Sequence, residues 1–195
     1  DGLPVFLPAT QENEFKITPQ QLDDCLKAHP RTKAFVLNSP SNPTGAVYSP
    51  DALKELCKVL ENYPNVLVIS DEVYEHMVYA PNQQYSVASF SEEFRNRTVQ
   101  VLSCSKSYAM TGWRIGWTAS NLELAKAIGK LESQSTSNPT SFAQAGAIKA
   151  LELGPNAETM AEFQKRGQVM RELLNDVPGF ECIEPQGAFY HFPKV

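Results

Sequence analysis

Short apolar runs alternate along the chain with longer segments in which apolar residues recur at helical spacing. The short runs are rich in Val, Ile, Leu and Phe, as expected for strands that are covered on both faces of a sheet. They predict strands at residues 4–8, 33–40, 65–71, 98–105 and 113–120. Strands that alternate with helices in this way are typical of an α/β protein with a mostly parallel sheet.

The segments with helical periodicity predict helices at residues 18–29, 49–62, 121–135, 141–153 and 156–176. Two of these helices begin with a hydroxyl residue followed by proline, because Thr18 precedes Pro19 and Ser49 precedes Pro50. A hydroxyl side chain is a favourable N-cap, and proline suits the first helical position because its missing N–H has no partner there. Beyond the last helix the pattern changes to strand, turn and strand, with Pro185 in the turn.

The change of pattern near residue 156 predicts the domain organisation. We expect residues 1–155 to form part of a large cofactor-binding domain, and residues 156–195 to form a connecting helix and the beginning of a small C-terminal domain. The first residues, DGLPVFLPAT, contain neither an initiator methionine nor a signal-peptide pattern, and the last residues stop on a strand-like run. We therefore expect the chain to be an internal fragment of a longer protein.

The composition is that of an ordinary globular protein, with 195 residues, 42% hydrophobic and 20% charged. A net charge of −5 argues against nucleic acid or an anionic membrane as the main partner. No run of about 18 apolar residues predicts a transmembrane helix. The cysteines lack CxxC spacing and a nearby histidine pair, so we expect no metal site, and reduced thiols in the cytoplasm. They are Cys25, Cys57, Cys104 and Cys182.

Polar side chains follow three of the predicted strands at their carboxyl ends, where ligands bind in open α/β sheets. The loops are NSPSNPTG (38–45), SDEVYEHMVY (70–79) and SCSKSYAMTGWRIGW (103–117). Their chemically interesting residues are Asn42, Asp71, Tyr74, Ser103, Ser105, Lys106 and Arg114. Taken singly, each has an ordinary explanation: a loop amide closes its own turn, a carboxylate caps a helix, and a lone lysine is a solvated charge.

Taken together, these groups match the needs of pyridoxal phosphate (PLP). A lysine that forms a Schiff base must be approached as the neutral amine, which requires a partly desolvated position near other cations. Lys106 would hold the aldehyde of the cofactor, and Asp71 would pair with its pyridinium nitrogen. Asn42 and Tyr74 would hydrogen-bond the phenolate oxygen.

The phosphate group of the cofactor would be held by Ser103, Ser105 and Arg114, with the planar guanidinium binding in a bidentate manner. The three loop motifs, in this order, resemble the class I/II aminotransferases, which are PLP enzymes of fold type I. The resemblance is closest to the bacterial-type branch that contains aspartate aminotransferases. The final PQGAFYHFP resembles the start of that family's small domain, so the similarity covers essentially the whole chain.

The resemblance implies a three-layer α/β sandwich with a mostly parallel sheet, followed by the start of a small α+β domain. It implies the roles given above for the seven residues, and a cis peptide bond before Pro43. It also implies transamination, in which an amino acid donates its amino group through the cofactor on Lys106 and a 2-oxo acid receives it. We expect aspartate and 2-oxoglutarate as the substrates, followed by aromatic or prephenate-type acceptors.

The resemblance further implies a cytoplasmic homodimer that acts in amino acid biosynthesis. Three features of the family find no match in the chain: a Gly-rich phosphate loop, an aromatic residue that stacks on the cofactor, and an arginine for the substrate α-carboxylate. We therefore expect the 195-residue chain alone to be inactive.

Three alternatives compete with this interpretation. A PLP-dependent lyase or synthase of the same fold, or a regulatory module that senses PLP without catalysis, would use the same residues. The run NVLVISDE also resembles a Walker B strand, which requires a GxxxxGK[ST] loop. The nearest match, IGKLE, lacks both the hydroxyl residue and the earlier glycine, which disfavours a nucleotide-binding protein.

Overall fold

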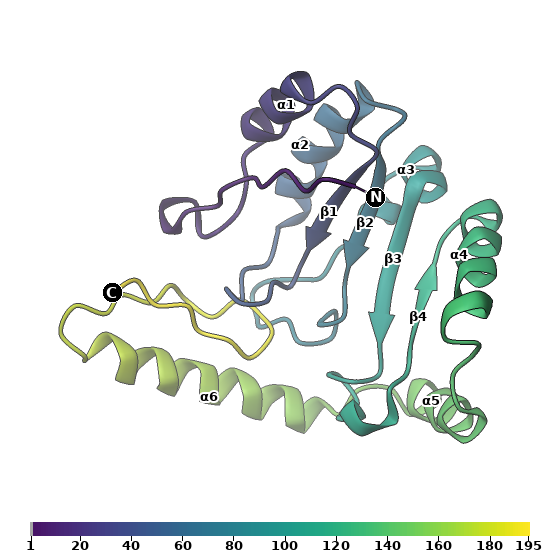
Figure 1. Ribbon diagram of the computed structural model, residues 1–195. Helices are drawn as coiled ribbons and strands as arrows, with labels where there is room; N and C mark the ends of the chain where they lie inside the picture. The colour runs from purple at the N-terminus through teal and green to yellow at the C-terminus, as the bar shows by residue number, and fades with distance from the viewer. Residues whose placement is uncertain (1) are drawn as a thin grey trace.

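The computed structural model describes residues 2–195, and these residues contain a four-stranded sheet of order β1-β2-β3-β4 (Figure 1). The strands are β1 (Ala34–Asn38), β2 (Leu67–Asp71), β3 (Thr98–Ser103) and β4 (Gly116–Ala119). The first three are parallel, and β4 is antiparallel to β3. The mostly parallel α/β sheet expected from the sequence is confirmed.

The register brings the ends of the parallel strands to one edge. Asn38 lies opposite Asp71, and Asp71 lies opposite Val101, two residues before the end of β3. Because parallel strands run in the same direction, the loops that follow them begin side by side. Ser103 pairs with Gly116, so the start of β4 lies at the same edge.

The six α-helices described within residues 2–195 surround the sheet, and α6 runs past the carboxyl ends of its strands (Figure 1). None of them combines the length and the apolar composition that crossing a membrane requires. They are α1 (Pro19–Ala28), α2 (Pro50–Glu61), α3 (Glu92–Arg97), α4 (Leu122–Ser135), α5 (Ser141–Leu153) and α6 (Ala157–Asn175). Short 3₁₀ helices lie at Gln11–Asn13, Val87–Ser89 and Thr111–Trp113.

The main hydrophobic core lies between one face of the sheet and helices α1 to α3. Leu22, Leu53 and Phe94 from these helices pack with Val68 of β2 in one buried cluster. The opposite face of the sheet is open in the described residues, where Val36 of β1 is 64% exposed. Side chains at the carboxyl edge are therefore reached from this open face.

The two predicted helix starts are confirmed by their caps. The Thr18 hydroxyl accepts a hydrogen bond from the amide of Gln21 (3.2 Å), and the Gln21 side chain accepts one from the Thr18 amide (2.8 Å). The Ser49 hydroxyl accepts a hydrogen bond from the amide of Ala52 (3.2 Å). Each cap satisfies amide groups that the helix itself leaves without partners.

The predicted strand at residues 4–8 is wrong, because this segment pairs with no strand of the described chain. Pro4 and Pro8 lack the N–H group that a sheet ladder requires, and Phe6 is 84% exposed. In place of the predicted C-terminal strands, the structure contains two isolated β-bridges, Val78 with Gly187 and Glu181 with Lys194. The short helix α3 was not predicted, because six residues are too few to show helical periodicity.

Arg97 connects the C-terminal end of α2 to the start of β3 through hydrogen bonds. Its guanidinium donates hydrogen bonds to the carbonyls of Leu60 (2.9 Å), Tyr63 (3.1 Å) and Val66 (3.1 Å), and pairs with Glu93 (2.9 Å). The Arg97 side chain is buried, and the carbonyls lie at or just beyond a helix C-terminus, where a cation is favourable. Because β3 leads into the loop that carries the lysine, this contact supports that loop.

Replacing Arg97 with alanine is expected to lower the free energy of unfolding by about 3 kcal/mol, because three carbonyls lose their donor. Urea unfolding followed by circular dichroism measures the change. The matched control is Arg95→Ala, which removes an exposed arginine from the same helix and is expected to cost less than about 0.5 kcal/mol. Equal losses in the two variants would contradict this role for Arg97.

Candidate active site

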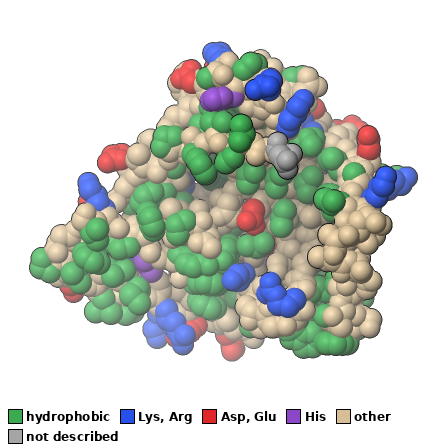
Figure 2. Space-filling model, viewed as in Figure 1, with side chains coloured by type: hydrophobic (Ala, Val, Ile, Leu, Met, Phe, Trp, Pro, Cys, Tyr) green, Lys and Arg blue, Asp and Glu red, His purple; other side chains and the backbone are tan. Residues whose placement is uncertain are grey.

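All seven residues singled out from the sequence lie at the carboxyl edge of the sheet. Figure 2 shows this region as a hollowed face with an acidic group at its centre and basic groups below it. Asn42 lies in the loop after β1, Asp71 ends β2 and Tyr74 follows it, Ser103 ends β3, Ser105 and Lys106 come next, and Arg114 precedes β4. The topology therefore brings residues that are up to 72 positions apart in sequence to one place.

The loop after β1 is tied to the end of β2 through Asn38. Its side-chain amide donates to the Asp71 carbonyl (3.2 Å), and its side-chain oxygen accepts from the amide of Asn42 (2.8 Å). The peptide bond between Asn42 and Pro43 is cis, which confirms the expectation from the sequence. These bonds fix Asn42 relative to the carboxylate of Asp71 on the neighbouring strand.

The amine of Lys106 lies beside two aromatic rings. Its Nζ is 5.7 Å from the ring centre of Tyr74 and 5.5 Å from that of Phe189. Aromatic faces attract a cation and partly desolvate it. Among residues 2–195, no carboxylate lies within ion-pair distance of Lys106. The amine therefore has no fixed negative partner in this part of the chain.

The phenol of Tyr74 is buried beside this amine. Its hydroxyl lies 2.6 Å from the hydroxyl of Tyr190. Burial, the Tyr190 hydroxyl and the charge of Asp71 raise the pKa of Tyr74 above its ordinary value, although the Asn42 side chain lowers it. Tyr74 is therefore a neutral phenol at physiological pH, with a proton that it can donate.

The residues expected to hold a phosphate form a looser group. The Ser103 hydroxyl accepts from the amide of Ser105 (3.0 Å) and donates to the Ile115 carbonyl (3.2 Å), so it orders the turn. Arg114 is exposed and donates through Nη1 to the Thr111 carbonyl (2.8 Å). No hydrogen bond within the described residues joins Arg114 to the other six, so its part in the site stays a prediction.

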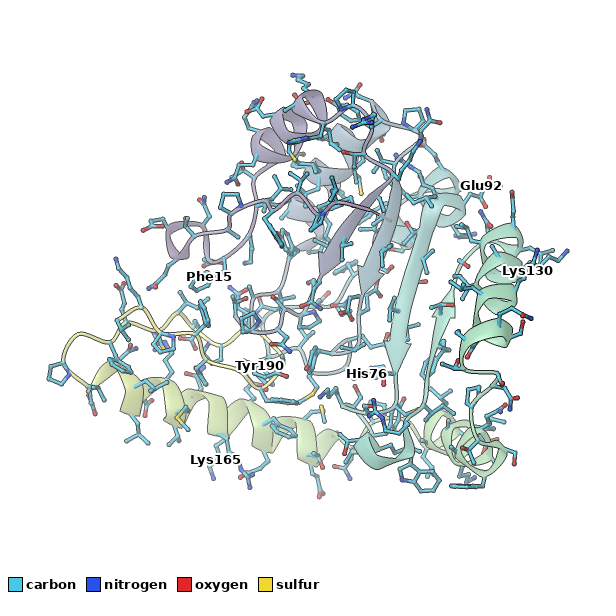
Figure 3. All side chains as sticks on the ribbon, in the orientation of Figure 1. Phe15, His76, Glu92, Lys130, Lys165 and Tyr190 are labelled. Carbon is cyan, nitrogen blue, oxygen red and sulfur yellow. The ribbon has the colours of Figure 1, made fainter. Side chains whose placement is uncertain are left out.

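A segment that the sequence reasoning assigned only to the small domain closes over the site. We call residues 186–190 the closing segment. The Gln186 side-chain oxygen accepts from the Val47 amide (2.9 Å), and the Gly187 amide donates to the Gly45 carbonyl (3.0 Å). The Ala188 amide donates to the Met77 carbonyl (2.7 Å). The loops after β1 and β2 thus hold the closing segment, which lies between the strand ends and α6 (Figure 3).

Glycine is required at position 187 because the backbones approach closely. A Cβ atom there would lie 2.7 Å from the Met77 carbonyl oxygen and 2.8 Å from a methyl group of Val47. The residues that sequence reasoning missed are therefore Phe189 and Tyr190, which this glycine brings against Lys106 and Tyr74. The sequence signal that could have identified Phe189 and Tyr190 is the pair of aromatic residues that follows the glycine in PQGAFY.

A cavity of about 440 Å³ opens on the α6 side of the lysine. Residues with polar or aromatic groups in its lining include Lys106, Ser107, Tyr108, Asn156, Thr159 and Phe189. The buried Ser107 hydroxyl has no hydrogen-bond partner among residues 2–195. The volume lies in the range of small-molecule sites. Asp71 and Asn42 do not line this cavity.

Comparison with known proteins identifies the family. Residues 2–195 match the family described as Aminotransferase class I and II. An aspartate aminotransferase of Geobacillus stearothermophilus is 46% identical over 197 residues, which are 100% of this chain and 49% of that protein. An aspartate/prephenate aminotransferase of Cereibacter sphaeroides is 44% identical over 197 residues, which are 100% of this chain and 48% of that protein.

The fold comparison agrees with the sequence comparison. The crystal structure of the aspartate aminotransferase from Rhizobium meliloti superposes with a TM-score of 0.92 and 39% identity, over 97% of this chain and 48% of that one. The chain spans about half the length of the curated relatives it matches. Because the family match extends over nearly every residue, and the sheet and its polar edge agree with it, the chain belongs to the class I and II aminotransferase family.

Proposed function

We propose that the full-length protein is a PLP-dependent aminotransferase that moves an amino group between an aspartate-like amino acid and a 2-oxo acid. The position of Lys106 supports this proposal most directly. Its amine lies at the carboxyl edge of the sheet beside two aromatic rings, has no carboxylate partner within the described residues, and lines a cavity. The similar relatives are named aspartate and aspartate/prephenate aminotransferases.

The residues at this edge fit PLP. The Asp71 carboxylate accepts one hydrogen bond, from the Val73 amide (3.3 Å), and so keeps the capacity to accept another from a protonated ring nitrogen. The buried phenol of Tyr74 and the side chain of Asn42 offer donors for the phenolate oxygen. Ser105 and Arg114 offer donors for a phosphate. Candidate partners for the ring nitrogen, the phenolate oxygen and the phosphate thus lie at one edge.

PLP, when bound, supplies the electron sink that stabilises negative charge at the substrate α-carbon. The Asp71 carboxylate would hold a proton on the ring nitrogen, which would keep that sink effective. Lys106 would hold the aldehyde group, and its Nζ would take and return the proton at the substrate α-carbon as a general base and acid. The rings of Tyr74 and Phe189 lie 5.7 and 5.5 Å from Nζ and partly desolvate it.

We infer that residues outside this chain bind the carboxylates of the substrate. Lys106 is the only charged residue that lines the cavity among those described, and the chain spans about half the length of its relatives. The α-carboxylate and the side chain of an aspartate-like substrate both require cations. The full-length protein is therefore needed for the test.

Transamination by the full-length protein is expected to consume aspartate and 2-oxoglutarate and to form oxaloacetate and glutamate in equal amounts. Coupled assays of both products, with PLP present, measure this ratio. Release of ammonia or another product without a 2-oxo acid acceptor would favour a lyase or synthase. A visible cofactor spectrum without turnover of any amino acid would favour a regulatory module, and either result would overturn the proposal.

The isolated chain of 195 residues is expected to show no turnover in the same assay. Without the groups that hold the substrate, the reaction loses the contribution of orientation, which is about 7–11 kcal/mol in well-ordered sites. The full-length protein, assayed at the same concentration, is the matched control. Turnover of the isolated chain at a rate comparable to the control would show that the substrate-binding groups lie within this chain.

We further propose that the full-length protein is a cytoplasmic homodimer in amino acid biosynthesis. Exposed apolar side chains on α4 and α5 support an interface with the rest of the protein or with a second copy. They include Leu131, Phe142, Ile148 and Leu153. Sedimentation of the full-length protein at about twice the mass of one chain is the expected result.

A further inference from the structure

The closing segment brings a second tyrosine hydroxyl to the cofactor edge. The Tyr190 and Tyr74 hydroxyl oxygens lie 2.6 Å apart, and either can be the donor. The two rings meet edge to face, with centroids 5.7 Å apart. The separation lies at the short end of the ordinary range for hydrogen bonds between hydroxyl groups. The two phenols are therefore directly coupled across 116 positions of sequence.

The position of Tyr190 is set by the residues just before it. The buried residue Ala188 has a positive φ of 55°, and its amide donates to the Met77 carbonyl (2.7 Å). The hydroxyl of Tyr79 donates to the Ala188 carbonyl. Since L-residues rarely adopt this backbone conformation, the contacts on both sides of Ala188 hold the chain in it. Tyr190 thus reaches Tyr74 from a constrained segment.

When a ligand accepts a hydrogen bond from Tyr74, the number of phenol protons determines which tyrosine is the donor in the Tyr74–Tyr190 hydrogen bond. A phenol carries one proton. If Tyr74 donates its proton to a ligand oxygen, it has none left for Tyr190, and Tyr190 must then be the donor in the pair. A hydroxyl that accepts one hydrogen bond becomes a stronger donor in the next, because the bonds polarise each other.

We propose that Tyr190 is a positioning residue that donates to Tyr74 and directs the single proton of Tyr74 towards the phenolate oxygen of the cofactor. This inference rests on the proposed function, because it concerns the same site. Burial raises the pKa of Tyr74, which keeps the proton on its phenol. Asp71 and Lys106 are the charged groups that face this phenol, and both remain in the variants below.

The visible absorbance of PLP bound to the full-length protein, titrated with pH, tests the role of Tyr190. Loss of a donor to the charged oxygen disfavours the deprotonated form, so Tyr74→Phe is expected to raise the apparent pKa of the visible band by about 1–2 units. Tyr190→Phe is expected to raise this pKa by roughly half a unit, because it weakens the hydrogen bond that Tyr74 donates to the phenolate oxygen without removing that bond. The double variant is expected to match Tyr74→Phe.

The matched control is Tyr79→Phe. It removes a hydroxyl that also holds the closing segment, but one that does not touch Tyr74, and it is expected to leave the apparent pKa unchanged. A band that titrates identically in Tyr190→Phe and the parent overturns the role of Tyr190 and leaves the proposed function intact. An equal shift in Tyr79→Phe also overturns it, since displacement of the segment then explains the effect. A parent protein without a PLP band overturns the proposed function as well.

Discussion

Replacing Lys106 with alanine in the full-length protein is expected to abolish the visible absorbance of bound PLP and to reduce turnover by roughly 10⁴-fold or more. Two functions are lost together, because one amine both binds the cofactor aldehyde and transfers the α-proton. The side chain forms no ion pair in the described residues and its amine lies beside two aromatic rings, so the fold should be retained. Absorbance spectra, steady-state rates and circular dichroism measure the three effects.

The control for this variant is Lys149→Ala. Lys149 lies on α5 and pairs with Glu152 (3.0 Å) on the exposed surface, so both the absorbance and the rate should match the parent protein. A Lys106→Ala protein that keeps the visible band and an appreciable rate would show that another residue carries the cofactor. Loss of circular dichroism in Lys106→Ala would instead show a structural role for this lysine.

Replacing Asp71 with asparagine is expected to lower the turnover by about 10³-fold while the protein still folds and binds PLP. The amide retains an oxygen that can accept from the Val73 amide, so the local structure should survive. It carries no negative charge, so the ring nitrogen of the cofactor loses its proton and the electron sink weakens. Steady-state kinetics measure the rate, and absorbance titration measures binding.

Asp51→Asn is the matched control for this variant. Asp51 is an exposed carboxylate in the first turn of α2 with a 3.6 Å ion pair to Lys54, and its replacement should leave turnover unchanged. A near-normal rate in Asp71→Asn would remove Asp71 from the mechanism. Loss of both PLP binding and turnover in Asp71→Asn would show that Asp71 anchors the cofactor rather than activating it.

The sequence by itself determined the sheet, most of the helices and the edge at which the polar residues gather. Local signals were sufficient for this, because apolar runs mark buried strands and the residues after them must lie at the carboxyl ends. The caps at Thr18 and Ser49 are equally local, since donor and acceptor lie three residues apart. For Asn42, Asp71, Tyr74 and Lys106, chain position alone therefore predicted proximity, and the structure brings their side chains together.

The tertiary structure decided which apolar segments pair and what closes over the lysine. Residues 4–8 have the composition of a strand, but two of them are prolines, which lack the N–H group of a sheet ladder, and the segment pairs with no strand of the described chain. The contact between Tyr74 and Tyr190 joins residues 116 positions apart and leaves no periodic trace in the sequence. It exists because Gly187 permits two backbones to approach, which is a property of the packed chain rather than of any local pattern.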